Sequence, residues 1–415
     1  MMRTKIREES KAYLFYIVAV MAGIAALLPL SCGYLMGGGI IGEWIARVKE
    51  VALGFGEGRL YLFPSAEVFA ECGVYQNPMD SSFWLLLPGA IYKFTGKMEL
   101  AYGVYMFLVQ VGTLAFALFM FCGLFPHRDR KMPACFGVLL YMTCPYRIYV
   151  SYELGDFSQT AAWMVLPLYV WAVTGILEEN GRRKRYVLVA ALALAGIGYG
   201  DVVYFLVAAG ITLLAGICKK RLWAWLPVVL GSLLFLPGLY RLARYLFLDE
   251  FGELNLPLKS IMPEGIRPGQ FFASYAFRDG HPGMGIGIFV CILAGIWLIF
   301  VERKTFCKKC RAFMSIALLG AVLSLEVFPW DLFQRLGFWA LKLVSLIGTP
   351  VVFWGIASAC LCIPAAYAME QTGRHEDKRI AFAVPVIVLL ACLGLCIYQC
   401  NMLTYTRFPL DLNIQ

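Results

Sequence analysis

The sequence predicts an all-α integral membrane protein with about eleven transmembrane helices. Of its 415 residues, 60% are hydrophobic and 15% are charged, whereas the charged fraction of an ordinary soluble domain is about a quarter. The lysines and arginines gather in short loops between apolar runs, which is the pattern of the positive-inside rule. The net charge of +9 therefore reflects membrane topology, and no nucleic-acid partner is implied.

The first helix and the segment after it set the orientation. Basic residues in 1–11 precede an apolar run over about 12–31, which predicts a cytoplasmic N-terminus. A long outer segment, 33–99, then contains two predicted interfacial helices. Residues 43–51 have helical periodicity with an aromatic edge, and residues 83–94 are too few to cross about 30 Å of hydrocarbon at about 1.5 Å per residue.

Basic loops place the remaining spans, because each such loop should face the cytoplasm. Residues 186–217 have basic flanks on both sides and predict a hairpin of two short helices that turns at Gly198–Asp201, with Asp201 facing a wet crevice. The whole chain, 1–415, is predicted to form a single membrane domain with an outer loop at 246–283 and an external C-terminus. The other predicted elements are spans at about 100–125, 133–150, 158–177, 222–245, 284–301, 312–328, 349–369 and 381–398, and a surface segment at 329–346.

This topology collects the unusual polar residues on the outer side, which predicts a cavity at the outer leaflet. A carboxylate there could act as general base on an acceptor hydroxyl, while Arg or Lys holds a lipid-linked phosphate. The candidate acids are Glu43, Glu67, Asp80, Glu153, Asp156 and Asp201; the candidate cations are Arg47, Arg147, Arg267, Arg278, Arg335 and Lys342.

Several candidates have a second interpretation. Glu153 and Asp156 are three residues apart, so a helix would place both on one face, but Asp156 could instead cap the following helix. Arg147 could be a snorkelling anchor. His281, in Asp-Gly-His-Pro-Gly, is typical of a turn residue as well as of a ligand.

Motifs of soluble enzymes are absent from the sequence, and no cofactor is identified. Cys307 and Cys310 form a C-x-x-C in a basic loop, but the sequence has no second pair and no nearby histidine. A zinc site is therefore not favoured, and no metal site is predicted.

Two short motifs carry a resemblance to a known family. Cys144-Pro145-Tyr146-Arg147 is followed by Gly155-Asp156-Phe157, and Phe328-Pro329-Trp330-Asp331-Leu332 is followed by the segment 347–355. In these motifs the chain resembles bacterial polytopic proteins related to the type-C-fold (GT-C) glycosyltransferases, some of which are labelled 6-pyruvoyl-tetrahydropterin synthase-related. The resemblance implies a GT-C-like fold in a bacterial cytoplasmic membrane and a polyprenyl-phosphate-linked sugar donor at the outer leaflet. The acceptor would be a cell-envelope glycan or lipid.

On this resemblance Asp156 or Glu43 is the catalytic base, Arg147 and Arg278 hold the phosphate, and the other substrate-binding candidates are Glu153, Asp201, His281 and Asp331. The family usually has a His-Asp pair in the first outer segment and a further His before an Arg-x-x-Glu-like helix. If that helix is aligned on Arg47, Gly39-Ile40 stand in place of the His-Asp pair and Trp44 in place of the further His. Two alternatives therefore stay open: a non-catalytic relative that binds lipid-linked glycan or assists envelope assembly, and a transporter or flippase.

Overall fold

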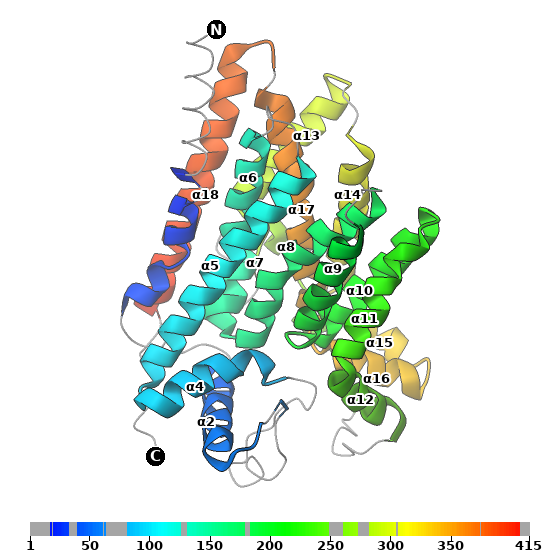
Figure 1. Ribbon diagram of the computed structural model, residues 1–415. Helices are drawn as coiled ribbons and strands as arrows, with labels where there is room; N and C mark the ends of the chain where they lie inside the picture. The colour runs from blue at the N-terminus through cyan, green and yellow to red at the C-terminus, as the bar shows by residue number, and fades with distance from the viewer. Residues whose placement is uncertain are drawn as a thin grey trace. The chain divides into compact units, whose positions relative to one another are not determined.

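The computed structural model describes residues 17–18, 20–32, 40–60, 62–63, 81–125, 131–178, 183–248, 260–272, 282–303, 306–373 and 375–406 (Figure 1). Across these ranges the chain is helical, apart from turns and one isolated bridge between Ile266 and Leu325. The all-α prediction is therefore confirmed for the described residues.

Four described helices are long and apolar enough to cross a membrane, which supports a multi-pass membrane protein. They are α5 (Met98–Leu124), α8 (Phe157–Leu177), α17 (Val351–Gly373) and the Arg379–Asn401 part of α18 (Lys378–Thr406). The total of about eleven spans, and the orientation of both termini, stay predictions.

One predicted span is not a continuous helix. Residues 222–245 were expected to cross once, but the chain forms η5 (Leu222–Ala224), α11 (Leu226–Leu234) and α12 (Leu236–Ala243). The piece Leu222–Leu234 and the piece Leu236–Phe247 meet at a bend of 78°. Pro237 lies in the first turn of α12, where its missing N–H and fixed φ suit a helix start rather than a helix interior. The bend therefore has a local cause in the sequence.

The chain divides into two compact units, each built from separate stretches of sequence. The first comprises Met1–Ser31, Ala117–Tyr149 and Ser260–Tyr405, and the second comprises Cys32–Phe116, Val150–Lys259 and Thr406–Gln415. Because α5 and the turn after Pro145 each pass from one unit to the other, the division does not separate consecutive domains. The expected single membrane domain stays a prediction.

In the first unit, α17 is the central helix, and nearly its whole surface is buried. It packs against the three helices α6, α13 and α14. The α6 helix ends at Met142, just before Cys144-Pro145, because a residue before proline is disfavoured in the α region. The described elements of this unit are η1 (Leu28–Cys32), α6 (Lys131–Met142), α7 (Pro145–Ile148), η8 (Met262–Glu264), η9 (Pro268–Phe272), α13 (Ile286–Phe300), α14 (Lys308–Leu323), α15 (Trp330–Gln334), α16 (Phe338–Ile347), α17 and α18.

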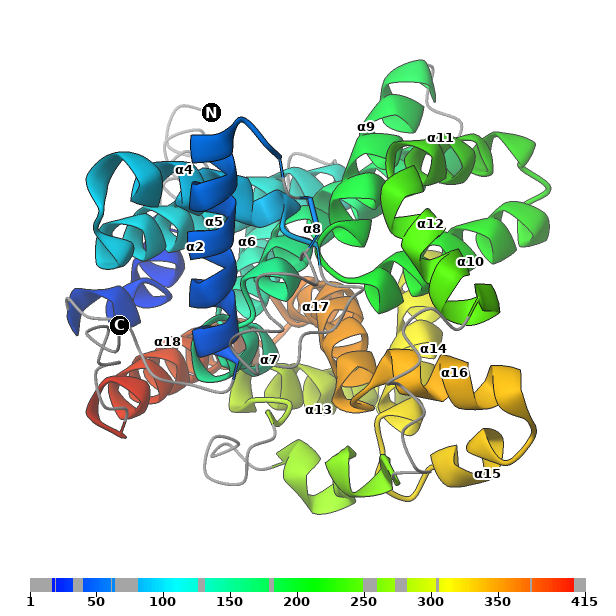
Figure 2. The same ribbon diagram turned by 90° about the horizontal axis from the view of Figure 1, so that it is seen from below.

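In the second unit, α8 packs on α9, and α9 packs on α10 and α11. The helix α2 is foreshortened in Figure 1 and seen along its length in Figure 2, so it lies crosswise to α5. The described elements of this unit are α2 (Ile41–Glu57), η2 (Phe83–Leu85), α4 (Leu86–Thr95), the first part of α5, η4 (Tyr149–Leu154), α8, α9 (Arg183–Gly198), α10 (Val202–Cys218), η5, α11, α12 and η6 (Arg244–Leu248).

Several local predictions are confirmed in this second unit. Helices form over both parts of the first outer segment, as α2 and as η2 with α4. The hairpin of α9 and α10 turns at Gly198–Asp201, as the glycines of that stretch predict. Whether α2 and α4 lie at a membrane interface stays a prediction.

Candidate functional site

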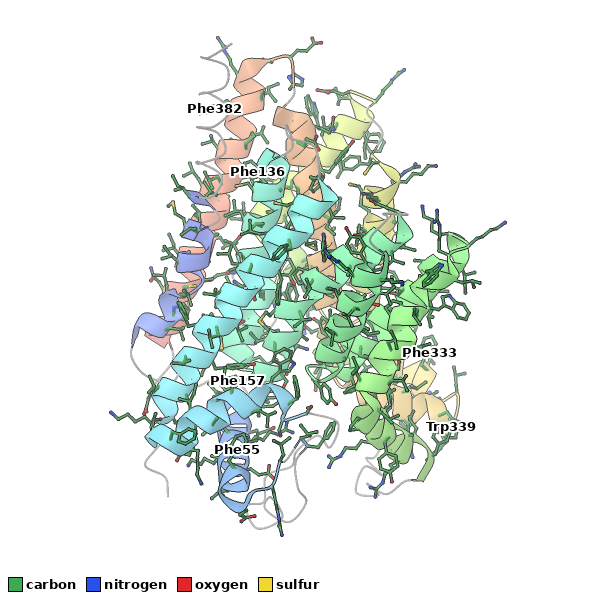
Figure 3. The ribbon with its side chains drawn as sticks, viewed as in Figure 1. Phe55, Phe136, Phe157, Phe333, Trp339 and Phe382 are labelled. Carbon is green, nitrogen blue, oxygen red and sulfur yellow. The ribbon has the colours of Figure 1, made fainter. Side chains whose placement is uncertain are left out.

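The N-terminus of α2 is fixed against the segment 150–157. The Ile40 N–H donates to the Leu154 carbonyl oxygen at 3.0 Å, and the Trp44 indole stacks on the Phe157 ring with centroids 6.4 Å apart. Figure 3 labels Phe157 where α8 begins. Gly155 has a φ of +72°, in the left-handed region, and a Cβ there would lie 2.9 Å from Ile41 Cβ. Glycine is therefore required at this contact.

The α2 helix buries two charged side chains. Arg47 is 1% exposed and Glu50 is 2% exposed, although charged residues are seldom fully buried in proteins unless they are paired. The Arg47 guanidinium carbon lies 4.5 Å from the centroid of the Trp44 ring, a cation–π distance. The buried charge of Arg47 is thus held against an aromatic face.

Two further arginines, Arg241 and Arg244, come from a segment that is distant from α2 in the sequence. Arg241, half-buried on α12, has Arg244, Arg47 and Glu50 as its charged neighbours. Its guanidinium carbon lies 4.6 Å from the Phe63 ring centroid. We call Arg47, Glu50, Arg241 and Arg244 the arginine cluster, because these three cations and one acid lie near one another.

A second group of polar residues lies at the N-termini of α8 and α10. Asp156 caps α8, because its Oδ1 accepts from the Gln159 N–H at 2.8 Å. Asp201 caps α10, because its Oδ1 accepts from the Val203 and Tyr204 N–H groups at 2.7 and 3.0 Å. Gln159 connects the two acids, because its backbone N–H donates to Asp156 and its side-chain Nε2 donates to Asp201 Oδ2 at 3.0 Å.

These two capping acids have defined structural partners. An N-cap carboxylate satisfies backbone N–H groups that the helix itself leaves unpaired. Burial raises the pKa of Asp201, and the hydrogen bonds from Gln159, Tyr204 and Val203 partly offset that rise. The hydrogen bonds therefore support the interpretation of Asp156 as a helix cap, and they show that Asp201 is a helix cap as well.

Glu43 is the acid on α2 itself, in the first helical turn and half-buried. Burial raises the pKa of Glu43 above its usual value, and Arg47, one turn later, works in the opposite direction. A carboxylate whose pKa is moved toward neutrality is better suited to accept a proton from a hydroxyl group.

The remaining candidates from the sequence lie elsewhere. Glu153 is 8% exposed in the π-helical turn η4 of the second unit. Arg147 is buried in the first unit, where its Nε donates to the Met142 carbonyl at 3.1 Å and its Nη2 contacts the same oxygen. It therefore serves the C-terminal end of α6, where a positive charge is favourable.

Asp331 belongs to the short helix α15 in the first unit. Arg278 and His281 lie outside the described residues, as do the acids Glu67 and Asp80. Within the described chain, the structure brings Asp156 and Asp201 together through Gln159.

Sequence reasoning did not single out Arg241, Arg244, Glu50 or Gln159. The two arginines end an apolar run with i, i+3 spacing, a signal that could have identified them as a charged face. Gln159 carried no such signal, because a single glutamine after an N-cap is common. Its role depends on the approach of α10 to α8, which the local sequence does not specify.

Comparisons with known proteins give little further information. No family model matches the sequence, and no curated protein matches it. The crystal structure of ArnT from Cupriavidus metallidurans bound to undecaprenyl phosphate is similar at a TM-score of 0.41 and 15% sequence identity, over 94% of this chain and 78% of that one. A similarity this low supports no conclusion about fold or function. The relationship to GT-C enzymes, and to the proteins labelled 6-pyruvoyl-tetrahydropterin synthase-related, stays a prediction.

Proposed function

We propose that this chain is a GT-C-like membrane glycosyltransferase that binds a polyprenyl-phosphate-linked sugar at the outer leaflet and transfers the sugar to a cell-envelope acceptor. The observation that carries the proposal is the arginine cluster of the second unit. Arg47, Arg241 and Arg244 lie near one another together with the acid Glu50, and two of the three guanidinium groups lie within 5 Å of an aromatic ring. Guanidinium groups bind phosphate bidentately and tolerate partial burial.

From the sequence, Arg147 and Arg278 were expected to bind the phosphate. Arg147 is already engaged with the end of α6, and Arg278 lies outside the described residues. We therefore propose Arg47, Arg241 and Arg244 as the phosphate-binding residues. On this proposal, Glu153 and Asp201 support the site from neighbouring elements.

Glu43 is the proposed base, in preference to Asp156. Asp156 accepts from the N-terminus of α8, whereas Glu43 has a raised pKa and lies one turn before Arg47. Glu43 would take the proton of the acceptor hydroxyl as its oxygen bonds to the anomeric carbon. The bond from that carbon to the phosphate oxygen breaks, and polyprenyl phosphate leaves with its new charge facing the arginines.

The first test measures lipid binding, with polyprenyl phosphate titrated into the purified full-length protein in nanodiscs. Replacing Arg241 with glutamine removes one charge-assisted contact, worth about 1.5–3 kcal/mol, so the affinity should fall about 10- to 150-fold. Arg59→Gln is the matched control, because Arg59 follows α2 in the same unit with its side chain 71% exposed. Equal affinity of Arg241→Gln and wild type would contradict the phosphate site.

The second test separates catalysis from binding. Glu43→Gln should reduce sugar transfer by about 10²- to 10⁴-fold, the usual effect of losing a general base, with lipid affinity unchanged. The non-catalytic alternative is favoured by Gly39-Ile40, which stand where the resemblance expects a His-Asp pair. Binding without turnover in wild type, across a panel of polyprenyl-phosphate sugars, would establish that alternative.

A further inference from the structure

The C-x-x-C sequence begins α14 in the first unit. Cys307 is the residue that precedes the helix and is exposed, while Cys310 lies in its first turn and is 1% exposed. Their sulfur atoms are 3.3 Å apart. A disulfide bond is about 2 Å long, so a small rotation of the two side chains would bring the sulfurs to bonding distance.

A cavity of about 310 Å³ adjoins this pair of thiols. Its lining combines Lys308 and Lys309 with apolar side chains. The two thiols are therefore next to a space that could hold a small molecule with an anionic group near the lysines. Its lining residues are Leu124, Phe125, Cys307, Lys308, Lys309, Cys310, Ile363 and Tyr367.

We propose that Cys307 and Cys310 form a redox-active dithiol whose substrates are small anionic disulfides. The Cys307 thiolate attacks one sulfur of the substrate, forms a mixed disulfide and releases one thiolate. Cys310 then loses its proton and attacks Cys307 Sγ, which closes the internal disulfide and releases the second thiol. In total, two protein thiols are oxidised, and one disulfide is reduced to two small thiols.

The environments of the two cysteines suit these different roles. The exposed Cys307 is accessible to a disulfide in solution, and the adjacent Lys308 and Lys309 would attract an anionic substrate. Burial, together with the neighbouring Cys307, raises the pKa of Cys310 well above its usual range. Cys310 therefore stays protonated and sheltered from solvent until a mixed disulfide forms next to it.

The test exposes the reduced full-length protein to oxidised glutathione and follows each cysteine by differential alkylation and peptide mass spectrometry. Wild type should accumulate the Cys307–Cys310 disulfide, and Cys310→Ser should accumulate a stable glutathione adduct on Cys307. Because closure requires the Cys310 thiolate, its rate should rise about tenfold per pH unit between pH 7 and 9. A mixed disulfide at Cys307 that persists equally in wild type and Cys310→Ser would overturn the proposal.

Cys218 provides a matched control within the same chain. It is exposed and is followed by Lys219 and Lys220, as Cys307 is followed by two lysines, but the sequence has no cysteine three residues later. Cys218 should form a glutathione adduct that never resolves internally. If Cys307 and Cys218 behave alike, the C-x-x-C has no redox function.

The contribution of the cavity is tested by the charge of the disulfide. Lys308→Gln should slow the reaction with oxidised glutathione by up to about fivefold, the scale of a partly exposed charge interaction, and leave neutral hydroxyethyl disulfide unaffected. Arg311→Gln is the control, because Arg311 is exposed in the same turn and does not line the cavity. Equal slowing by both variants would exclude a specific role for the cavity.

Discussion

The hydrogen bond between Gln159 and Asp201 gives a prediction whose size and pH dependence follow from the structure. Gln159 is 4% exposed, and its Nε2 donates to Asp201 Oδ2 at 3.0 Å. Gln159→Met keeps the length of the side chain but removes the donor. The carboxylate then loses a charge-assisted hydrogen bond, and the free energy of unfolding should fall by about 1.5–3 kcal/mol.

The sign of the pH dependence follows from the raised pKa of Asp201. Because the folded pKa lies above the unfolded value of about 3.9, the folded state favours the protonated acid, and ionisation of Asp201 costs stability as the pH rises. Removing the Gln159 donor raises that folded pKa further. The effect of Gln159→Met should therefore be largest at neutral pH and decline as the pH falls through the folded pKa.

Asp201→Asn should have the opposite effect. The asparagine Oδ1 can still accept from the Val203 and Tyr204 N–H groups, and its Nδ2 can donate to Gln159 Oε1, which has no hydrogen-bond partner among the described residues. No buried charge remains, so this variant should equal or exceed wild type in stability at neutral pH, with less pH dependence.

The assay is reversible unfolding in mixed detergent and SDS micelles, at several pH values, with all four members of the double-mutant cycle. The matched control is Gln110→Met, because Gln110 is 2% exposed in the same unit and its Nε2 donates to the neutral Tyr152 hydroxyl at 3.4 Å. That variant should cost about 0.5–1.5 kcal/mol without pH dependence. Additive effects of Gln159→Met and Asp201→Asn, or equal pH profiles for the two glutamine variants, would refute the assigned bond.

Three other predictions follow from the same structure. Gly200→Ala should destabilise by about 1–3 kcal/mol in the same unfolding assay, because its Cβ would lie 2.7 Å from a backbone oxygen of α8, whereas Gly210→Ala, with open space around it, should be neutral or stabilising by up to about 1 kcal/mol. Sugar transfer should decline on acidification with a midpoint above 4.5, because burial raises the pKa of Glu43 above that value; a pH–rate profile with no acidic limb would contradict this assignment. Arg147→Gln should destabilise by about 1.5–3 kcal/mol, because Arg147 is buried and bonded to the end of α6, while the exposed Arg335→Gln should change unfolding by less than about 0.5 kcal/mol.

Local features of the fold could be predicted from the sequence because they depend on local chemistry. The hairpin turn at Gly198–Asp201 and the helix over 43–51 follow from glycine placement and helical periodicity. The break of residues 222–245 was missed, although Pro237 was visible, because the apolar run continues through it. Apolar length alone does not show whether a proline starts a new helix or kinks an existing one.

The candidate site was harder to predict because it depends on contacts between distant segments. Asp156 and Asp201 were both recognised as unusual acids, but their shared partner, Gln159, depends on how α8 meets α10. Arg241 joins Arg47 across nearly two hundred positions of sequence, and no local pattern gives that proximity. The sequence therefore identifies which residue types are costly in a membrane, and the fold decides which of them meet.

The capping hydrogen bond of Asp156 makes this residue less suited than Glu43 to act as the catalytic base. If Asp156 were the base, it would have to leave the N–H group of Gln159 during each turnover and leave a helix N-terminus unsatisfied. Glu43 faces no such cost, and it lies on the same helix, α2, as Arg47 of the arginine cluster. In such an enzyme, Glu43→Gln should reduce sugar transfer without weakening lipid binding. Arg47→Gln should reduce both. The pair Glu43→Gln and Arg47→Gln therefore distinguishes a transferase from a lipid-binding relative.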